Sequence, residues 1–173
     1  MREPASAAWT RWLLVSAAIV AADLATKAWI ARAFLPGEVH TVTPFFNLVL
    51  VYNTGAAFSF LAGAGGWQRW FFMGVSIAVS IVIVAMLRRN APQQKLLSSA
   101  LALVLGGAVG NLYDRLTLGH VVDFVQLHAA GYYWPAFNVA DSAISVGVAL
   151  LVWDSLANRG QESGIGNQGS GIK

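Results

Sequence analysis

The stretch Phe137-Asn138-Val139-Ala140-Asp141-Ser142 begins an apolar run that continues to Ala157. A run of this length can cross about 30 Å of hydrocarbon as a helix, which takes roughly 20 residues. Asp141 stands near its start, and hydrocarbon does not solvate a carboxylate, so this group needs a partner, a wet cavity or a functional role. The stretch therefore predicts a membrane-spanning helix with an acid at one membrane face.

Three further apolar stretches have a similar length. The chain of 173 residues is 57% hydrophobic and only 11% charged, which is about half the charged fraction of a typical soluble domain. Composition and pattern predict an all-α membrane protein with four transmembrane helices. The predicted spans run from Trp12 to Ala31, from Trp70 to Leu87, from Leu96 to Tyr113 and from Phe137 to Ala157.

The first span has the length of a secretory signal peptide. However, Asp23 and Lys27 interrupt its apolar core, and no convincing small-residue cleavage site follows. We therefore expect it to remain as a span.

Basic residues lie mainly on one side of the predicted spans. Cytoplasmic loops are enriched in Lys and Arg, so this side and both termini are predicted to be cytoplasmic. The seven tryptophans all fall near span ends, as aromatic belts require. Cations scattered in this way do not form the basic stripe of a nucleic-acid-binding protein, despite the formal charge of +3. The cytoplasmic cations are Arg2, Arg11, Arg88, Arg89, Lys95 and Arg159.

Two loops, from Phe34 to Gly66 and from Leu116 to Ala136, are then predicted to face outward. The β-branched and aromatic content of the first favours a small extracytoplasmic β-containing loop with one or two strands. The apolar second loop favours an interfacial loop or helix. Residues 1–159 are predicted to form one domain, and the Gly- and Ser-rich residues 160–173 a disordered cytoplasmic tail.

Asp123 and Asp141 are candidate catalytic residues because the predicted topology brings both to the outer face. Asp123 lies in the apolar pentad Val121-Val122-Asp123-Phe124-Val125, where an acid is either a buried paired group or a functional one. For Asp141 a simpler explanation exists, since Asn138 can cap the helix and the macrodipole favours an acid in the first turn. Capping does not explain Asp123, so we favour acid–base chemistry by the pair.

Other polar residues are predicted to lie near this outer site. Asn111 and Arg115 share one face of the third span, and Asn53 follows the strand-like run of the first loop. Asp23 and Lys27, four residues apart, are expected to form a buried pair that supports the site.

Two features of the third span have structural explanations. Gly106 and Gly110 form a small-xxx-small pair that lets another helix approach closely. Asp114 can form an ion pair with Arg115 or with another base.

Other chemistries have weaker support in the sequence. His120, Asp123 and His128 could be imagined as metal ligands, but no His-Glu-x-x-His motif is present. The chain has no Gly-x-Ser-x-Gly elbow, and the absence of cysteine excludes a thiol nucleophile. A serine–lysine pair that uses Lys27 stays open, although no serine has a distinctive context.

At these residues the chain resembles lipoprotein signal peptidase, or signal peptidase II, the membrane aspartic peptidase family of bacteria. Five blocks carry the resemblance and have the order and spacing of the family. They are Asp23-Leu24-Ala25-Thr26-Lys27, Asn53-Thr54-Gly55-Ala56-Ala57-Phe58, Gly106-Gly107-Ala108-Val109-Gly110-Asn111-Leu112-Tyr113-Asp114-Arg115, Val121-Val122-Asp123-Phe124 and Phe137-Asn138-Val139-Ala140-Asp141-Ser142.

The resemblance implies a multi-pass enzyme of the inner membrane, with its active site at the outer face. It would remove signal peptides from prolipoproteins just before the diacylglyceryl-modified cysteine, with membrane lipids around it, globomycin as an inhibitor and no metal or organic cofactor. Asp123 and Asp141 would be the catalytic pair, and Asp23 and Lys27 would support the site. The residues implied to surround or position substrate are Asn53, Asn111, Arg115, Asn138 and Ala140.

Two close carboxylates are expected to share a proton, with Asp141 at the helix N-terminus more often ionised and Asp123 protonated.

A small transporter or proton-relay protein is an alternative class. Such proteins commonly have paired halves and broken helices near the midplane, whereas this sequence shows neither feature and its acids cluster at one face. A non-enzymatic assembly or chaperone subunit for lipoproteins is a second alternative.

Overall fold

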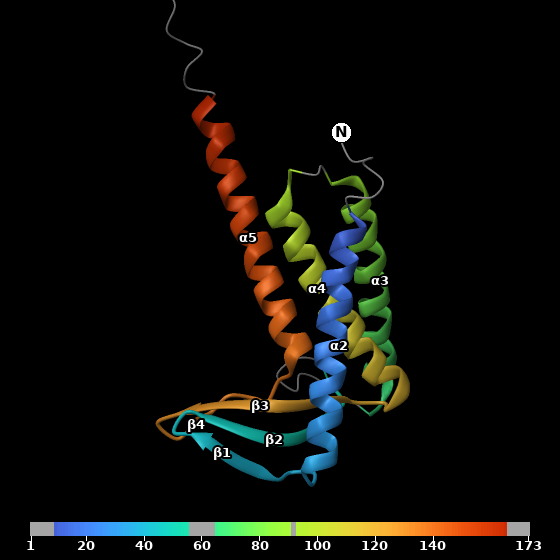
Figure 1. Ribbon diagram of the computed structural model, residues 1–173, viewed down its shortest axis with the longest axis vertical. Coiled ribbons are helices and arrows are strands. Elements are labelled where there is room, and N and C mark those ends of the chain that lie inside the picture. The colour runs from blue at the N-terminus through green and yellow to red at the C-terminus, as the bar shows by residue number, and fades with distance from the viewer. Residues whose placement is uncertain (1–8, 56–64, 91–92, 166–173) are drawn as a thin grey trace, which may run out of the picture.

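The computed structural model describes residues 9–55, 65–90 and 93–165 (Figure 1). Arg2 and residues 56–58 of the second sequence block lie outside the described residues. Within the described part, four helices are long and apolar enough to cross a membrane, in agreement with the four predicted spans. They are α2 (Thr10–Ala33), α3 (Trp67–Arg89), α4 (Lys95–Thr117) and α5 (Val139–Ile165).

Helix α4 is the centre of the bundle and packs against the other three helices. In the most apolar stretch of α4, 61% of the residues are buried, compared with 22% in that of α2 and 17% in those of α3 and α5. Glycine makes this packing possible, because a Cβ added at Gly106 would lie 2.8 Å from the Cβ of Ile19 and 2.9 Å from the carbonyl oxygen of Ser16. At Gly110 it would lie 2.7 Å from Oδ2 of Asp23. The close helix approach predicted from these two glycines is confirmed.

A four-stranded antiparallel sheet lies across one end of the bundle, opposite the start of α2 and the end of α5 (Figure 1). Its strands, in spatial order, are β1 (Val39–Thr43), β2 (Phe46–Asn53), β3 (Val121–Ala129) and β4 (Tyr132–Tyr133). The first outer loop contains strands, as predicted. The second was predicted to be an interfacial loop or helix, and its described residues form β3 and β4 instead, because its β-branched and aromatic side chains suit a pleated surface.

Contacts between residues far apart in the sequence hold β3 to the helix bundle on one side and to β2 of the sheet on the other. Val51 of β2 pairs with Asp123 of β3, and the buried side chains of Leu50 and Phe124 pack in one cluster with Ile30 of α2. The backbone carbonyl of Phe137 accepts hydrogen bonds from the N–H groups of Phe124 (3.0 Å) and the following residue (2.8 Å). The start of α5 is thereby tied to β3.

Helix α5 extends beyond the predicted end of the fourth span at Ala157 and continues to Ile165. Its backbone therefore includes residues 160–165, for which we predicted disorder. The Gly- and Ser-rich composition lowers helix propensity but does not prevent continuation of an established helix, since propagation is easier than nucleation. Residues 166–173 lie outside the described residues.

Replacement of Gly106 by alanine should lower the stability of the bundle. The new methyl group would collide with Ser16 and Ile19 of α2, and overpacking of this kind costs about 1–3 kcal/mol. We expect a lower midpoint of thermal unfolding for Gly106→Ala in detergent. Gly74→Ala in α3 is the matched control, since a Cβ there meets no atom within 4 Å. Equal midpoints for the two variants would contradict the close packing of α2 on α4.

Candidate active site

Asp123 lies on β3 and is almost completely buried, with 1% of its surface exposed. Both of its carboxylate oxygens accept hydrogen bonds from asparagine amides. Nδ2 of Asn138 donates to Oδ1 at 2.7 Å, and Nδ2 of Asn53 donates to Oδ2 at 2.9 Å. Strand pairing places Asn53 opposite Val121, which shares a face of β3 with Asp123 because strand side chains alternate. The two amides thus compensate for the loss of water around the carboxylate.

Asp141 lies in the first turn of α5 and forms a reciprocal cap with Asn138. The backbone N–H of Asp141 donates to Oδ1 of Asn138 at 2.8 Å, and the backbone N–H of Asn138 donates to Oδ2 of Asp141 at 3.3 Å. The predicted capping role is therefore confirmed. Asp141 also accepts a hydrogen bond of 2.7 Å at Oδ1 from Nδ2 of Asn111 on α4, which capping alone does not require.

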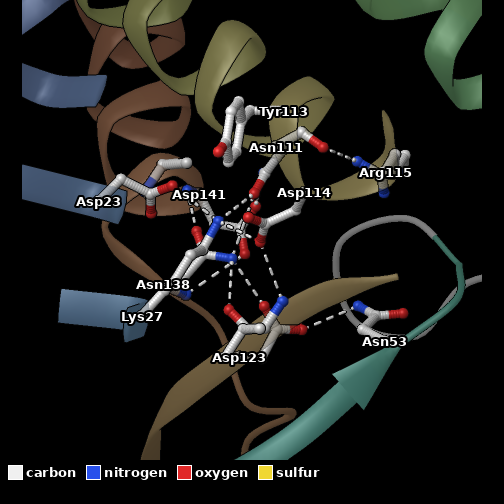
Figure 2. Close-up of polar contacts among 12 residues, drawn as sticks. Asp23, Lys27, Asn53, Asn111, Tyr113, Asp114, Arg115, Asp123, Asn138 and Asp141 are labelled. Carbon is white, nitrogen blue, oxygen red and sulfur yellow. Dashed lines mark hydrogen bonds and ion pairs between the residues drawn. The ribbon is translucent and has the colours of Figure 1, made fainter. Parts of the chain in front are cut away.

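Asn138 connects the two aspartates. Its amide oxygen accepts from the N–H of Asp141, while its amide nitrogen donates to Asp123 (Figure 2). The tertiary structure therefore brings together the two acids that the sequence places eighteen residues apart, on β3 and at the start of α5.

Lys27 occupies a buried position beside this pair. Its Nζ lies 2.7 Å from Oδ2 of Asp23 and 2.9 Å from Oδ2 of Asp114. It also donates a hydrogen bond of 3.0 Å to Oδ1 of Asn111. The predicted Asp23–Lys27 pair is confirmed. Of the two partners left open for Asp114, Lys27 is the one that the structure shows.

Asp23 also reaches α5. Its Oδ1 accepts a hydrogen bond of 2.9 Å from the backbone N–H of Ala140, whose side chain is fully buried. The carbonyl oxygen of Ala140 would collide with a Cβ at Gly107 of α4. Ala140 thus lies in the contact between α4 and α5, where a larger side chain has no room.

Arg115 of α4 points toward β2 and α3. Its Nη2 donates to the carbonyl oxygen of Gly55 at 2.6 Å, and its guanidinium carbon lies 5.3 Å from the ring centre of Phe72. Within the described part of the chain Arg115 forms no ion pair, and its buried Nε has no hydrogen-bond partner. The guanidinium is therefore held in place by its two terminal nitrogens, and its Nε–H is available to donate.

Asp141 borders a cavity on each side of α5. The first, of about 360 Å³, lies between α3, α4 and α5. Its polar lining includes Asn53, Asn111 and Arg115, and most of its remaining wall is apolar. The second, of about 380 Å³, extends toward the sheet and is lined by Trp134 among other side chains. An extended or acylated ligand can therefore reach Asp141 through apolar surroundings.

Burial raises the pKa of Asp123 to about 7, and the neighbouring charge of Asp141 raises it in the same direction. The amides of Asn53 and Asn138 and the charge of Lys27 oppose this rise without cancelling it. Asp123 can therefore carry a proton near neutral pH. Two adjacent acids in different environments can divide the roles of acid and base between them.

His120 and His128 pack against tyrosine rings. The ring of His120 lies 4.3 Å from that of Tyr52, and His128 stacks on Tyr133 at 5.3 Å. Among the described residues no three His, Asp or Glu side chains form a group that could hold a metal ion.

From the sequence, Asp114 is assigned only an ion pair and no place in the site. The spacing of three between Asn111 and Asp114 places both on one helical face, and this signal could have indicated a shared role.

Known proteins share this architecture and sequence. Residues 15–157 match the family described as signal peptidase (SPase) II. The lipoprotein signal peptidase of Paraburkholderia phymatum is 51% identical over 156 residues, which cover 90% of this chain and 93% of that protein. The lipoprotein signal peptidase of Janthinobacterium sp. is 53% identical over 150 residues, which cover 87% and 90%.

Two solved structures have the same fold. A bacterial membrane enzyme solved by the in meso method at 2.3 Å resolution has a TM-score of 0.80 and 30% identity, with 95% of both chains covered. A second, solved by the same method at 1.9 Å, has a TM-score of 0.74 and 33% identity, with 85% of this chain and 93% of the other covered. Together with the family match across most of its length, these relatives show that this chain belongs to the signal peptidase II family.

Proposed function

We propose that this protein is an aspartic endopeptidase that removes the signal peptide from diacylglyceryl-modified prolipoproteins and cleaves just before the lipidated cysteine. The observation that carries this proposal is the bridging of Asp123 and Asp141 by Asn138 beside an apolar cavity. The names of the relatives support the substrate class.

The two aspartates would divide the proton transfers of hydrolysis. Asp141, ionised, accepts a proton from water as the water oxygen attacks the scissile carbonyl carbon. Asp123, protonated, donates its proton to the developing oxyanion. Asp141 then returns the proton to the leaving amine as the C–N bond breaks, and Asp123 recovers its own from the collapsing diol. The pKa of Asp123, raised to about 7, supports this assignment.

Substrate positioning would use the polar end of the first cavity. The free Nε–H of Arg115 can donate to a peptide carbonyl, and its two anchored nitrogens keep it in place. We assign Asn53, Asn111 and Asn138 mainly to the orientation of the carboxylates, since their Nδ2 atoms already donate to Asp123 or Asp141.

The proposed location is the bacterial inner membrane, with both termini cytoplasmic and the active site at the outer face. The distribution of Lys and Arg supports this orientation, because Arg88, Arg89 and Lys95 lie at the end of the bundle opposite the sheet (Figure 1). Residues 1–159 would then form the peptidase domain. A globomycin-type inhibitor is expected to occupy one of the two cavities that border Asp141.

A direct test uses the purified protein and one lipidated prolipoprotein peptide in detergent or nanodiscs. We expect cleavage by the protein alone at the bond before the modified cysteine, identified by mass spectrometry of both products. Intact peptide after prolonged incubation would favour an assembly subunit or a transporter.

Neutralisation of either acid should abolish turnover. Asp123→Asn and Asp141→Asn each remove a proton carrier while they preserve side-chain volume, and a general acid or base contributes about 100- to 10,000-fold to rate. We expect kcat to fall by at least about this factor, with folding and insertion retained in circular dichroism. Asp154→Asn, about 20 Å further along α5 by the rise of a helix, is the matched control. Near wild-type cleavage by either dyad variant would refute the catalytic pair.

Activity should decline as pH rises through about 7. Burial and the charge of Asp141 disfavour the ionised form of Asp123, so its pKa lies above the usual value and its proton is lost in this range. The measurement is kcat at saturating lipidated substrate between pH 5 and about 9, with stability checked at each pH. A profile that stays flat up to pH about 9 would show that no proton on Asp123 is required.

Cleavage should depend on the lipid anchor. Most of the hydrophobic free energy of the acyl chains is already gained in the bilayer, at about 0.8 kcal/mol per methylene, so their useful contribution is the alignment of the scissile bond with the depth of the aspartates. We expect an unlipidated precursor in the same membrane to be cleaved slower by about 100-fold or more. Equal rates at matched membrane concentration would indicate a general membrane peptidase.

A further inference from the structure

One carboxylate oxygen of Asp114 makes an ion pair and accepts a hydrogen bond, and these two contacts lead to different aspartates. Oδ2 lies 2.9 Å from Nζ of Lys27 and accepts a hydrogen bond of 3.1 Å from the backbone N–H of Val122. Asp114 itself is 2% exposed, and among the described residues no hydrogen bond or ion pair joins it to Asp123 or Asp141. We propose that Asp114 is a positioning residue that holds both catalytic aspartates, an inference that rests on the function proposed above.

The first connection runs through Lys27 to Asp141. An ammonium group only donates, so the atom of Asn111 that faces Lys27 at 3.0 Å must be the amide oxygen. The amide nitrogen of Asn111 is then directed at Asp141, to which it donates at 2.7 Å. Lys27, held by Asp23 and Asp114, therefore determines that Asp141 faces a donor rather than an acceptor.

The second connection runs through the backbone of β3. Val122 immediately precedes Asp123, and its N–H is anchored to α4 by the hydrogen bond that it donates to Asp114. The carbonyl oxygen of Val122 accepts a further bond of 3.3 Å from Nδ2 of Asn138, the amide that also donates to Asp123. Asp114 thus fixes the position of the strand at the residue beside the catalytic carboxylate (Figure 2).

The arrangement also has an electrostatic consequence. One positive charge, on Lys27, lies between the negative charges of Asp23 and Asp114. Removal of the charge on Asp114 would leave Lys27 with a single counter-ion and expose the catalytic pair to more positive potential, which favours loss of the shared proton. Removal of the charge on Lys27 would have the opposite effect. The charged or titratable groups that face this cluster are Asp23, Lys27, Arg115, His120, Asp123 and Asp141.

The test compares the pH dependence of kcat for two charge variants with lipidated peptide. For Asp114→Asn we expect kcat to fall roughly 10- to 100-fold with little change in KM, because the residue does not touch substrate. Its basic limb should move to lower pH by about one pH unit. For Lys27→Met the basic limb should move to higher pH. A purely structural role predicts lower stability without shifts of opposite sign.

Two controls complete the design. Asp154→Asn makes the same charge change far from the cluster and should leave the profile in place. Asp114→Glu keeps the charge but moves it, so kcat should fall while the basic limb of the pH profile stays at the same pH. If one charge variant fails to insert into the membrane, the direction in which the basic limb shifts in the other variant still tests the inference. Folded Asp114→Asn or Lys27→Met with an unshifted limb would overturn the inference, whereas loss of activity in Asp123→Asn would leave the peptidase itself supported.

Discussion

The cost of charge in an apolar environment controls this structure. Hydrocarbon and protein interior solvate ions poorly, so every buried carboxylate at the end of the bundle beside the sheet needs a donor. The Lys27 ammonium forms ion pairs with Asp23 and Asp114 and donates a hydrogen bond to Asn111. Because these partners come from α2 and α4, and Asp23 also binds the backbone of Ala140 on α5, one cation fixes three helices relative to one another.

Close helix packing allows this network to form. Glycines on α4 bring its backbone near α2 and α5. The side chain of Asp23 lies beside Gly110 and accepts a hydrogen bond from α5. A side chain at that position would occupy the space of the carboxylate. The small residues that drive helix association in membranes therefore also provide the route by which polar groups find their partners.

Asparagine amides connect this frame to Asp123 and Asp141. An amide offers a donor and an acceptor in a fixed geometry, so each asparagine can accept from the scaffold and donate to one of the two carboxylates. Asn53 accepts from the N–H of Gly55, and Asn138 from that of Asp141, before each donates to Asp123. Among the described residues neither of these two carboxylates forms an ion pair of its own, in keeping with the raised pKa of Asp123. Such an arrangement suits chemistry on a substrate that already lies in the membrane.

Features that depend on local rules could be predicted from the amino-acid sequence: the four spans, the close approach at Gly106, the Asp23–Lys27 pair and the cap at Asn138. Each follows from hydropathy, helical spacing or helix ends, which involve neighbours within a few residues. The tertiary structure alone decided that the second outer loop adds strands to the sheet and that Asp114 pairs with Lys27 rather than with Arg115. Strand register and helix packing set these contacts between residues far apart in the chain, and no local pattern specifies which distant donor a buried carboxylate will meet.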